Sequence, residues 1–309
     1  MTEQPGRLML LDTASLYFRA FFGVPEITGP DGTPVNAVRG LLDFISRLVG
    51  DYRPSDLVCC WDDDWRPQWR VDLLPSYKAH RVVAERTGVP DVEEIPDPLV
   101  VQVPIIRDVL DAFGICVVGA PGYEADDVIG SLASQARQPV DIVTGDRDLF
   151  QLVDDERDVR VLYIARGVGN HERVTNDWVR SKYGVDAHQY ADFATLRGDA
   201  SDGLPGVAGV GEKTAATLLG RFGDMDGIVA AAYDAESDLG PGPRAKLKAA
   251  APYLEVAPQV VAVARELDLG SPATTLPAQP RDLPRVAELG ARWGIESPVQ
   301  RLTDVLCSR

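Results

Sequence analysis

Acidic residues follow several short apolar segments of the sequence, each at the point where the apolar segment ends. Asp12 and Asp62 come directly after such segments, and Asp146 and Asp148 follow a third one through Thr144 and Gly145. Three more stand at the predicted start of a helix: Glu124, Asp126 and Asp127. Ligands of open parallel sheets bind in the crevice beyond the carboxyl ends of the strands. If the apolar segments are parallel strands, the sequence gathers these acids at one edge of a sheet.

Carboxylates that are held close together repel one another, and one member of a pair normally has a raised pKa. Hard divalent cations such as Mg²⁺ and Mn²⁺ remove this conflict because they prefer oxygen ligands. Two such ions about 4 Å apart can activate an attacking water and stabilise the leaving oxygen of a phosphodiester. A single aspartate after a strand is more often a turn former or a helix N-cap, and the helix dipole favours acids in a first turn. Only the whole set of acids indicates a metal site.

The apolar segments have the length and the β-branched or aromatic content of buried strands. They cover residues 8–11, 57–61, 115–118, 140–143 and 159–164. Segments with helical spacing lie between them, at 38–49, 100–113 and 125–136. This alternation predicts an α/β fold in which helices cover both faces of a mostly parallel sheet.

Two parts of the chain depart from that alternation. Residues 64–98 contain scattered Trp, Pro, Arg and Glu, and such a long excursion inside an α/β domain is commonly a functional lid or arch. From about residue 178 onward the pattern is helical, with a Pro-rich connector at 270–284 between two late helices. A second, helical region is therefore predicted to follow the sheet.

The composition is that of an ordinary globular protein, with 309 residues of which 45% are hydrophobic and 25% charged. The net charge of −16 disfavours nucleic acid on average, but a metal-dependent phosphodiesterase concentrates its carboxylates in one place and keeps basic residues on other faces. The four cysteines show no CxxC spacing, which predicts a reduced cytoplasmic protein without a zinc site. The first apolar run is too short for a signal peptide or a membrane span, so no membrane contact is expected.

Residues 204–214 form a glycine-rich turn that at first looks like a nucleotide-binding loop. A P-loop needs Lys where this chain has Glu212, and the glycine spacing differs from a dinucleotide fingerprint. What remains is a helix-hairpin-helix, a motif that grips a DNA backbone without reading its sequence. Backbone N–H groups would approach a phosphate at Gly206, Gly209 and Gly211, and Lys213 would add positive charge. Tight packing between two helices is the alternative explanation of the glycines.

Five blocks of the sequence resemble the signature motifs of the bacterial 5′ nuclease family. They lie at 11–12 together with 17–22, at 77–81, at 122–130, at 144–152 and at 198–207, and the resemblance runs from about Leu8 to beyond Trp293. The chain resembles the 5′-3′ exonuclease domain of DNA polymerase I as a free-standing protein. The resemblance implies a PIN-like nuclease core at 1–177 with a helical arch at about 64–98. It also implies a helical DNA-binding region at 178–309, whose helix-hairpin-helix at about 196–222 carries a monovalent ion such as K⁺.

The resemblance also assigns roles to the acids. One of two or more Mg²⁺ or Mn²⁺ ions would lie among Asp12, Asp62, Glu124 and Asp126. The other would lie among Asp126, Asp146, Asp148 and Asp202, while Asp127 and Asp199 would act mainly through bound waters. The register of one ligand is open between Asp62 and Asp63, and Asp62 is preferred because it directly follows the strand. The family usually has Glu and Asn where this chain has Ala200 and Gly203, a change that removes no expected ligand.

Basic and aromatic side chains complete the site that the family implies. Lys78 and Arg81, at the base of the arch, would polarise the scissile phosphate, and their spacing of three would place both on one helical face. The alternative is that both are ordinary solvated side chains. Tyr77 would stack on an unpaired terminal base, and Arg19 would contact a phosphate nearby.

The sequence thus predicts a structure-specific 5′ nuclease that cuts DNA with 5′ flaps, 5′ overhangs or RNA primers by a two-metal mechanism, in primer removal and repair. No polymerase domain follows Arg309, so a separate polymerase and a ligase are expected partners, and the protein is expected to be a monomer. One alternative is a DNA-binding protein of the same fold that does not cut, which would have lost an essential ligand. Another is a toxin-type metal-dependent RNase, a compact protein that lacks the long helical half.

Overall fold

The computed structural model describes residues 6–84 and 91–309, and its centre is a six-stranded sheet in the order β5-β2-β1-β6-β7-β8. The strands are β1 (Leu8–Asp12), β2 (Asp56–Cys60), β5 (Cys116–Val118), β6 (Val140–Thr144), β7 (Val159–Tyr163) and β8 (Glu172–Val174). Neighbouring strands are parallel except for β7 and β8. The five predicted strands and the mostly parallel sheet are confirmed, and the short antiparallel edge strand β8 is an addition to them.

Both faces of the sheet are buried. Met9 and Leu11 of β1 face a core formed with α2 (Asn36–Tyr52) and α5 (Gln102–Phe113). Leu8 and Leu10 face the opposite core, which includes α6 (Ala125–Gln135). Because successive side chains of a strand point to opposite faces, a strand covered on both sides must be apolar throughout. The three predicted helices correspond to α2, α5 and α6.

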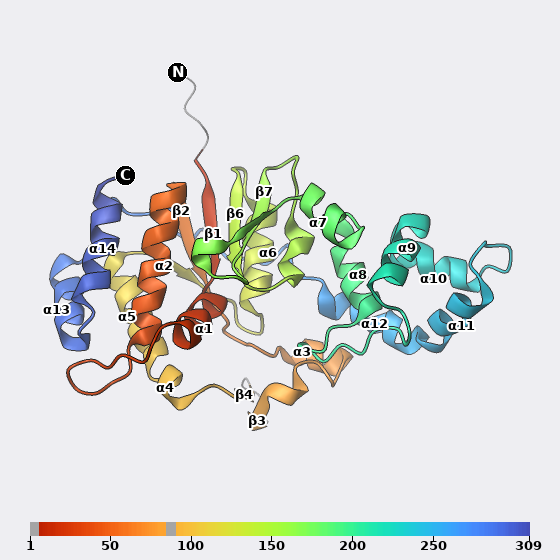
Figure 1. Ribbon diagram of the computed structural model, residues 1–309, viewed down its shortest axis with the longest axis horizontal. Helices are drawn as coiled ribbons and strands as arrows, with labels where there is room; N and C mark the ends of the chain where they lie inside the picture. The colour runs from red at the N-terminus through yellow and green to blue at the C-terminus, as the bar shows by residue number, and fades with distance from the viewer. Residues whose placement is uncertain (1–5, 85–90) are drawn as a thin grey trace, which may run out of the picture.

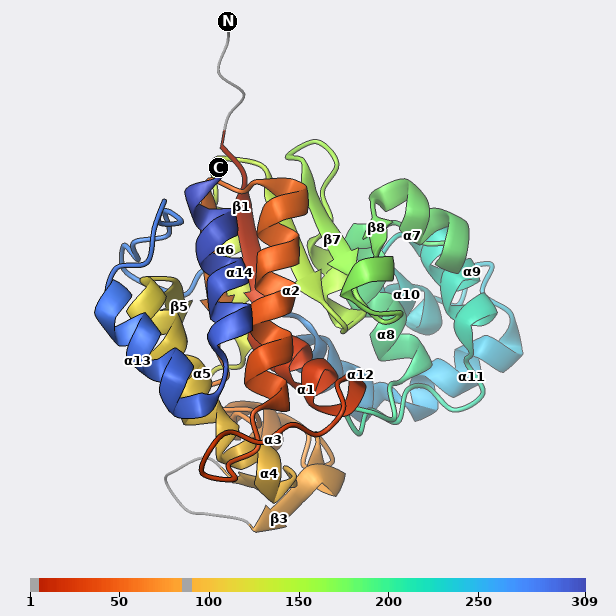
Figure 2. The same ribbon diagram turned by 60° about the vertical axis from the view of Figure 1, so that its left-hand side comes forward.

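The chain returns to the sheet at its C-terminal end. Helices α13 (Leu283–Trp293) and α14 (Glu296–Cys307) pack beside α5 and α2, as Figures 1 and 2 show. The segment before them is the predicted connector, and the Leu57 N–H of β2 donates to its Thr274 carbonyl at 2.9 Å. The last two helices of the predicted helical region thus pack on helices that cover the sheet. No helix in the described part of the chain has both the length and the apolar character needed to cross a membrane.

The predicted arch lies beyond the carboxyl ends of the strands (Figure 1). Its elements are α3 (Gln68–Leu73), the 3-10 turn η1 (Ala79–Arg81), the antiparallel hairpin of β3 (Val82–Ala84) with β4 (Val92–Glu93), and α4 (Asp97–Val100). The expectation of a helical arch is thus only partly right, because a hairpin forms its middle. Residues 85–90 of the predicted arch lie outside the described residues.

The helical region extends away from the sheet at the end of the molecule opposite α13 (Figure 1). Its helices are α7 (Asn176–Tyr183), α8 (Tyr190–Arg197), α9 (Glu212–Phe222), α10 (Met225–Tyr233), α11 (Pro241–Ala249) and α12 (Ala251–Val261). The remaining elements are α1 (Thr13–Gly23) and the 3-10 turns η2 (Asp148–Leu152), η3 (Val168–Asn170) and η4 (Ala187–Gln189).

An aromatic cluster joins the helical region to the sheet. The ring of Phe150 in η2 makes edge contacts with Tyr163, Trp178 and Tyr190, at centroid distances of 5.1, 5.5 and 5.3 Å. Such edge-to-face pairs stabilise beyond the area that they bury. Because Asp148 begins η2, this cluster also fixes the position of that acid.

Candidate active site

Eight of the nine predicted metal-binding acids line a connected crevice at the carboxyl edge of the sheet. One cavity of the crevice is lined by Asp12, Asp62, Glu124, Asp126 and Asp146, with Lys78 and Arg81. A second cavity shares Glu124 and Asp126 with the first and adds Asp148 and Asp202. A third shares Asp146 and Arg81 with the first and adds Asp199, Arg19 and Arg147. We call these eight acids and their cavities the acidic crevice.

Asp12 is held at the end of β1 by two hydrogen bonds. Its Oδ1 accepts from the Ser15 N–H at 3.0 Å and so caps α1, while its Oδ2 accepts from the Thr144 hydroxyl at 2.7 Å. The same hydroxyl accepts from the Asp146 N–H at 2.9 Å. Asp12 therefore both caps α1 and lines the crevice. The Thr144 hydroxyl, which bonds to Asp12 and to the Asp146 N–H, aligns the ends of β1 and β6.

The three acids of the run 62–64 make different contacts. Asp62 lines the crevice and accepts from the Ala125 N–H at 2.8 Å, next to Glu124. Asp63 points to the outside, where it pairs with Arg107 at 3.4 Å and remains 35% exposed. Asp64 accepts from the Arg66 N–H at 3.2 Å. The preference for Asp62 over Asp63 agrees with this arrangement.

Burial of the crevice acids raises the pKa values of several carboxyls. The pKa of Asp62 rises to about 7, mainly by desolvation. Burial and the nearby charge of Asp146 raise the pKa values of Asp126 and Asp148 well above the ordinary value. The carboxylates of Asp126 and Asp148 have no hydrogen bond or ion pair with any described residue. Two acids of the crevice are thus left without a hydrogen-bonded or ion-paired partner in the described part of the chain.

The acids do not stand in a preformed coordination sphere. Within residues 6–84 and 91–309, no three His, Cys, Asp or Glu side chains are arranged to hold a metal ion. The carboxylates share one crevice, but they do not converge on one point. Ligation would therefore require rotation of these side chains.

Lys78 is buried against the acids and is not a solvated side chain. Its ammonium group forms an ion pair with Glu124 Oε2, and the side chain is 11% exposed. Burial alone would lower the pKa of Lys78, but the charge of Glu124 and neighbouring groups raises it well above its ordinary value. Arg81 instead pairs with Asp202 Oδ1 at 3.2 Å. The solvated alternative therefore does not fit Lys78, whereas the Arg81 side chain is still 34% exposed.

The prediction that Lys78 and Arg81 share one helical face is also wrong. Lys78 has a left-handed backbone, with φ of +48°, and only the three residues after it form a 3-10 turn. The Lys78 N–H donates to the Asp202 carbonyl at 3.0 Å, which anchors this bend to the helical region. The two cations reach the crevice from a turn, each toward a different acid.

Tyr77 is not placed to stack on a base. The side chain is 5% exposed, and its hydroxyl donates to Glu124 Oε1 at 2.7 Å. The stacking role predicted for Tyr77 does not fit this arrangement, because the ring is covered by protein. Arg19 lies in the third cavity, where it donates to the Ala165 carbonyl at 3.0 Å. Its predicted phosphate contact stays a prediction.

Asp127 does not belong to the acidic crevice, because both of its oxygens are taken by the protein. The fully buried carboxylate accepts two hydrogen bonds from Arg70, each of 2.7 Å, and one from the Ala264 N–H at 2.8 Å. The predicted role of Asp127 toward metal-bound water is therefore replaced by an ion pair. Sequence spacing could not reveal this pair because Arg70 lies 57 residues away.

Arg70 is the residue near the site that the sequence patterns missed. It extends from α3 of the arch and is 2% exposed. Besides Asp127, its guanidinium donates to Glu124 Oε1 at 3.1 Å and to the Val260 carbonyl at 3.0 Å. Residues 260–264, which we call the strap, comprise the last two residues of α12 and the three residues after it. Arg70 therefore ties the arch, the crevice and the strap together.

The hairpin between α8 and α9 has glycines of two kinds. Gly206 has φ of +66°, and a Cβ there would lie 2.6 Å from the Arg197 carbonyl carbon, so backbone packing requires it. Gly209 has φ of +70° and its carbonyl accepts from the Lys246 ammonium at 2.8 Å. Gly211 has open space around its Cβ position, and Lys213 is exposed at the start of α9. Packing thus explains Gly206 but not Gly211.

Comparison with known proteins assigns residues 7–283 to known families. A family described as 5′-3′ exonuclease, N-terminal resolvase-like domain, matches residues 7–184, and one described as 5′-3′ exonuclease, C-terminal SAM fold, matches residues 185–283. The chain is 62% identical to a 5′-3′ exonuclease of Streptomyces coelicolor, over 96% of this chain and 99% of that protein. It is 53% identical to a 5′-3′ exonuclease of Mycobacterium tuberculosis, over 97% of each. It is 39% identical to DNA polymerase I of the same species, over 91% of this chain and 30% of that protein.

Solved structures share the fold at much lower sequence identity. The bacteriophage T5 D15 flap endonuclease, solved with DNA and metal ions, aligns with a TM-score of 0.65 and 17% identity, over 97% of this chain and 99% of that chain. The catalytic core of Rad2 in complex with a DNA substrate aligns with a TM-score of 0.60 and 16% identity, over 98% and 93% of the two chains. The predicted α/β core followed by a helical region is confirmed by these likenesses.

Arg70→Met removes the cation between two carboxylates inside the protein. Loss of one partner of a buried ion pair leaves an uncompensated charge and typically costs about 3–5 kcal/mol. We therefore expect Arg70→Met to lower the free energy of unfolding by about that amount, measured by urea unfolding with circular dichroism. Arg180→Met is the control, because Arg180 pairs at the surface with Asp186 and exposed pairs contribute only about 0–1 kcal/mol. Equal losses in the two variants would contradict the structural role of Arg70.

Proposed function

The chain belongs to the 5′-3′ exonuclease family of phosphodiester hydrolases, and on that premise we propose that it cuts 5′-flapped or 5′-ended DNA with divalent metal ions held in the acidic crevice. The substrates would be DNA with a 5′ flap, a 5′ overhang or an RNA primer. We place this activity in primer removal and DNA repair, beside a separate polymerase and a ligase. The related T5 structure, solved with DNA and metal ions, supports the proposal.

The observation that carries the proposal is a pair of crevice carboxylates that have no hydrogen-bonded or ion-paired protein partner. Asp126 and Asp148 line the crevice that Asp146 also lines, and neither carboxylate forms a hydrogen bond or ion pair with any described residue. The eight acids of the crevice offer carboxylate oxygens, and no His or Cys is among the described residues that line its cavities, which suits Mg²⁺ or Mn²⁺ and does not suit a soft metal. The donor chemistry therefore fits two hard cations.

We assign the acids as follows. One ion would be held among Asp12, Asp62, Glu124 and Asp126, and the other among Asp126, Asp146, Asp148 and Asp202. Bound divalent ions would supply an activated water and stabilise the leaving oxygen of the phosphodiester. Asp199 would act through waters, since its oxygens already accept from Arg197 at 3.1 Å and from the Ser201 N–H at 2.9 Å.

Lys78 and Arg81 would each give up an ion pair with an acid of the crevice and contact the substrate phosphate instead. In the structure each cation neutralises one crevice acid, Glu124 or Asp202. If those carboxylates held a metal ion instead, both cations would be free to contact the scissile phosphate. Charge that develops on the phosphate in the transition state would then be stabilised by groups already at the site.

The hairpin would hold the duplex away from the crevice. The exposed N–H groups around Gly211 and the start of α9 suit a phosphate, and Lys213 adds a positive charge there. Gly206 and Gly209 shape the turn, which would carry a monovalent cation such as K⁺. Arg19 would contact a phosphate from the third cavity. Asp199 and Asp202 begin the same turn, so a duplex held by the hairpin is directed toward the acids.

The test of this proposal separates cutting from binding with Asp148→Asn. We expect the parent to cleave a labelled 5′-flap duplex with Mg²⁺ or Mn²⁺ and not with chelator. Asp148→Asn should fall to the chelator level while its affinity for the duplex, measured by gel shift in Ca²⁺, stays within a few-fold. The physical reason is that Asp148 would hold a metal ion and does not contact the DNA backbone.

Asp63→Asn is the matched control, because Asp63 belongs to the same acidic class but points outward to Arg107. It should cleave at the parental rate. Parallel loss of binding and cleavage in Asp148→Asn would sink the assignment. A parent that binds the flap without cutting it under any metal would favour a non-catalytic DNA-binding protein of the same fold.

Lys78→Ala should lower the single-turnover rate on a 5′ flap by about 10²- to 10³-fold, the usual effect of removing one electrostatic donor to a transition state. Flap affinity should change far less, because the charge develops only during the reaction. Arg81→Ala should have a milder effect, and the double variant should lose less than the product of the two. His80→Ala, at an exposed position between them, is the control. A rate for Lys78→Ala within about threefold of the parent would exclude its catalytic role.

A further inference from the structure

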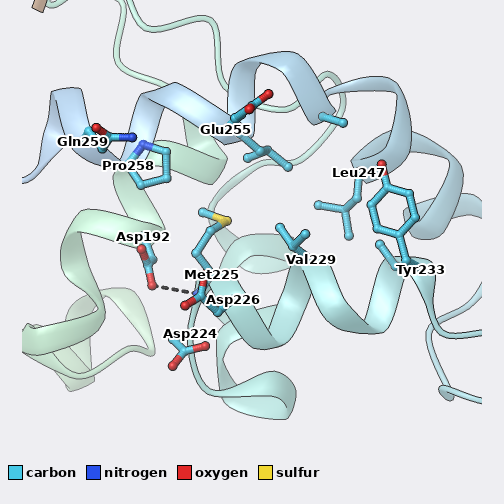
Figure 3. A pocket seen from close by; sticks show the side chains of 13 residues that line it. Asp192, Asp224, Met225, Asp226, Val229, Tyr233, Leu247, Glu255, Pro258 and Gln259 are labelled. Atoms are coloured by element: carbon cyan, nitrogen blue, oxygen red, sulfur yellow. Dashed lines mark hydrogen bonds between the residues drawn. The ribbon is translucent and has the colours of Figure 1, made fainter. Parts of the chain in front are cut away.

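A cavity of ≈ 590 Å³ lies in the helical region, away from the acidic crevice (Figure 3). Its walls come from α8, α10, α11 and α12 and from the turn before α10. None of the residues that line it lines the crevice. The volume is in the range of protein cavities that enclose several side chains or a ligand. This cavity has no part in the function proposed above.

The cavity has an acidic end and an apolar end. In Figure 3, Asp192, Asp224 and Asp226 lie together on one side, and Leu247 and Tyr233 lie on the other. Met225 and Val229 form the surface between them, and Glu255 projects from the opposite helix α12. No Lys or Arg is among the described residues that line this cavity. Lys248 contacts the ring of Tyr233, at 5.1 Å from its centroid, but lies outside the lining.

Two of the four acids have structural roles, and two do not. Asp192 accepts from the Met225 N–H at 2.9 Å, and Asp224 caps α10 by accepting from the Gly227 N–H at 2.8 Å. Asp226 and Glu255 form no hydrogen bond or ion pair with any described residue, and both are exposed. The helix dipole can explain an acid in the first turn of α10, but Glu255 stands in the middle of α12. Free negative charge thus lies on both sides of the cavity.

The apolar end has an aromatic side chain that the fold does not cover. Tyr233 is 60% exposed, whereas Leu247 and Leu254, which also line the cavity, are 2% and 6% exposed. Aromatic residues are enriched in protein interfaces because they bury a large area at low entropic cost. A partly open apolar wall beside unpaired acids therefore has the character of a docking surface, and its charge disfavours a nucleic acid.

We infer that this cavity docks a cationic segment of a partner protein, in which Lys or Arg side chains stand next to exposed leucine-like or aromatic side chains. The cations would meet Asp226 and Glu255, and an apolar side chain would enter between Val229, Leu247 and Tyr233. The charge complementarity commits the surface to a basic partner. An amphipathic helix laid in a groove between helices is a recurrent form of such recognition.

The probe is a fluorescein-labelled amphipathic helical peptide with Leu on one face and Lys on the other, titrated with the full chain at physiological salt and followed by anisotropy. We expect the double variant Asp226→Asn/Glu255→Gln to bind about tenfold more weakly than the parent, equivalent to about 1.4 kcal/mol. Its matched control is Asp234→Asn/Glu236→Gln, which removes the same charge from exposed positions just beyond α10. That control should bind like the parent.

Tyr233→Glu separates docking from general attraction by an acidic chain. The substitution adds a negative charge at an exposed position. Non-specific attraction would therefore strengthen peptide binding. Docking predicts weaker binding, because the apolar end of the cavity loses its aromatic side chain and gains a charge. Equal effects of the two double variants, or stronger binding by Tyr233→Glu, would overturn the inference. So would a self-association of the parent, seen by sedimentation, that Asp226→Asn/Glu255→Gln abolishes, because the occupant would then be a second copy. None of these readouts depends on nuclease activity.

Discussion

Mutual repulsion of carboxylates at one edge of a parallel sheet is the constraint on which the rest of this structure depends. Burial of Asp126, Asp146 and Asp148 removes the water that would otherwise screen their charges. The fold offsets part of the repulsion by setting Lys78 against Glu124 and Arg81 against Asp202. The remainder is left for cations from solution. Carboxylate repulsion at this edge of the sheet lowers the free energy of unfolding of the protein. The same carboxylates make the edge suited to hold metal ions beside a phosphodiester.

Glu124 shows how the arch and the crevice depend on each other. Its Oε1 accepts from the Tyr77 hydroxyl and from Arg70, and its Oε2 pairs with Lys78. All three partners belong to the arch, so a movement of the arch changes the orientation of this acid. Arg70 extends the connection through Asp127 to the strap, and the strap is bound on its other side by Gln151, whose side chain donates to the Val261 carbonyl at 3.1 Å. Arch, sheet and helical region are thereby coupled through a few charged groups.

The features that could be predicted from the sequence are the strands and helices, which follow from hydrophobic periodicity, and the acids that stand where a strand ends. Asp12 and Asp62 could be placed because an apolar strand that is buried on both faces ends at a recognisable residue. The ion pairs of Asp127 with Arg70 and of Lys78 with Glu124 could not be predicted, because the partners are far apart in the sequence. Until its distant partner is known, a buried carboxylate is indistinguishable from a metal ligand. Tyr77 was misassigned for the same reason, since burial of its ring depends on tertiary packing. The edge strand β8 has only three residues and one buried side chain, too little for a pattern.

The measurement that tests this account most directly is thermal unfolding with and without Mn²⁺. A ligand that binds only the folded state raises the melting temperature with its concentration. The account predicts that Mn²⁺ stabilises the parent, and that Asp148→Asn melts higher than the parent in chelator, because one repelling charge is gone, while gaining less from Mn²⁺. The account would be contradicted by a parent whose melting temperature does not change in millimolar Mn²⁺, or by an Asp148→Asn variant that melts lower than the parent in chelator.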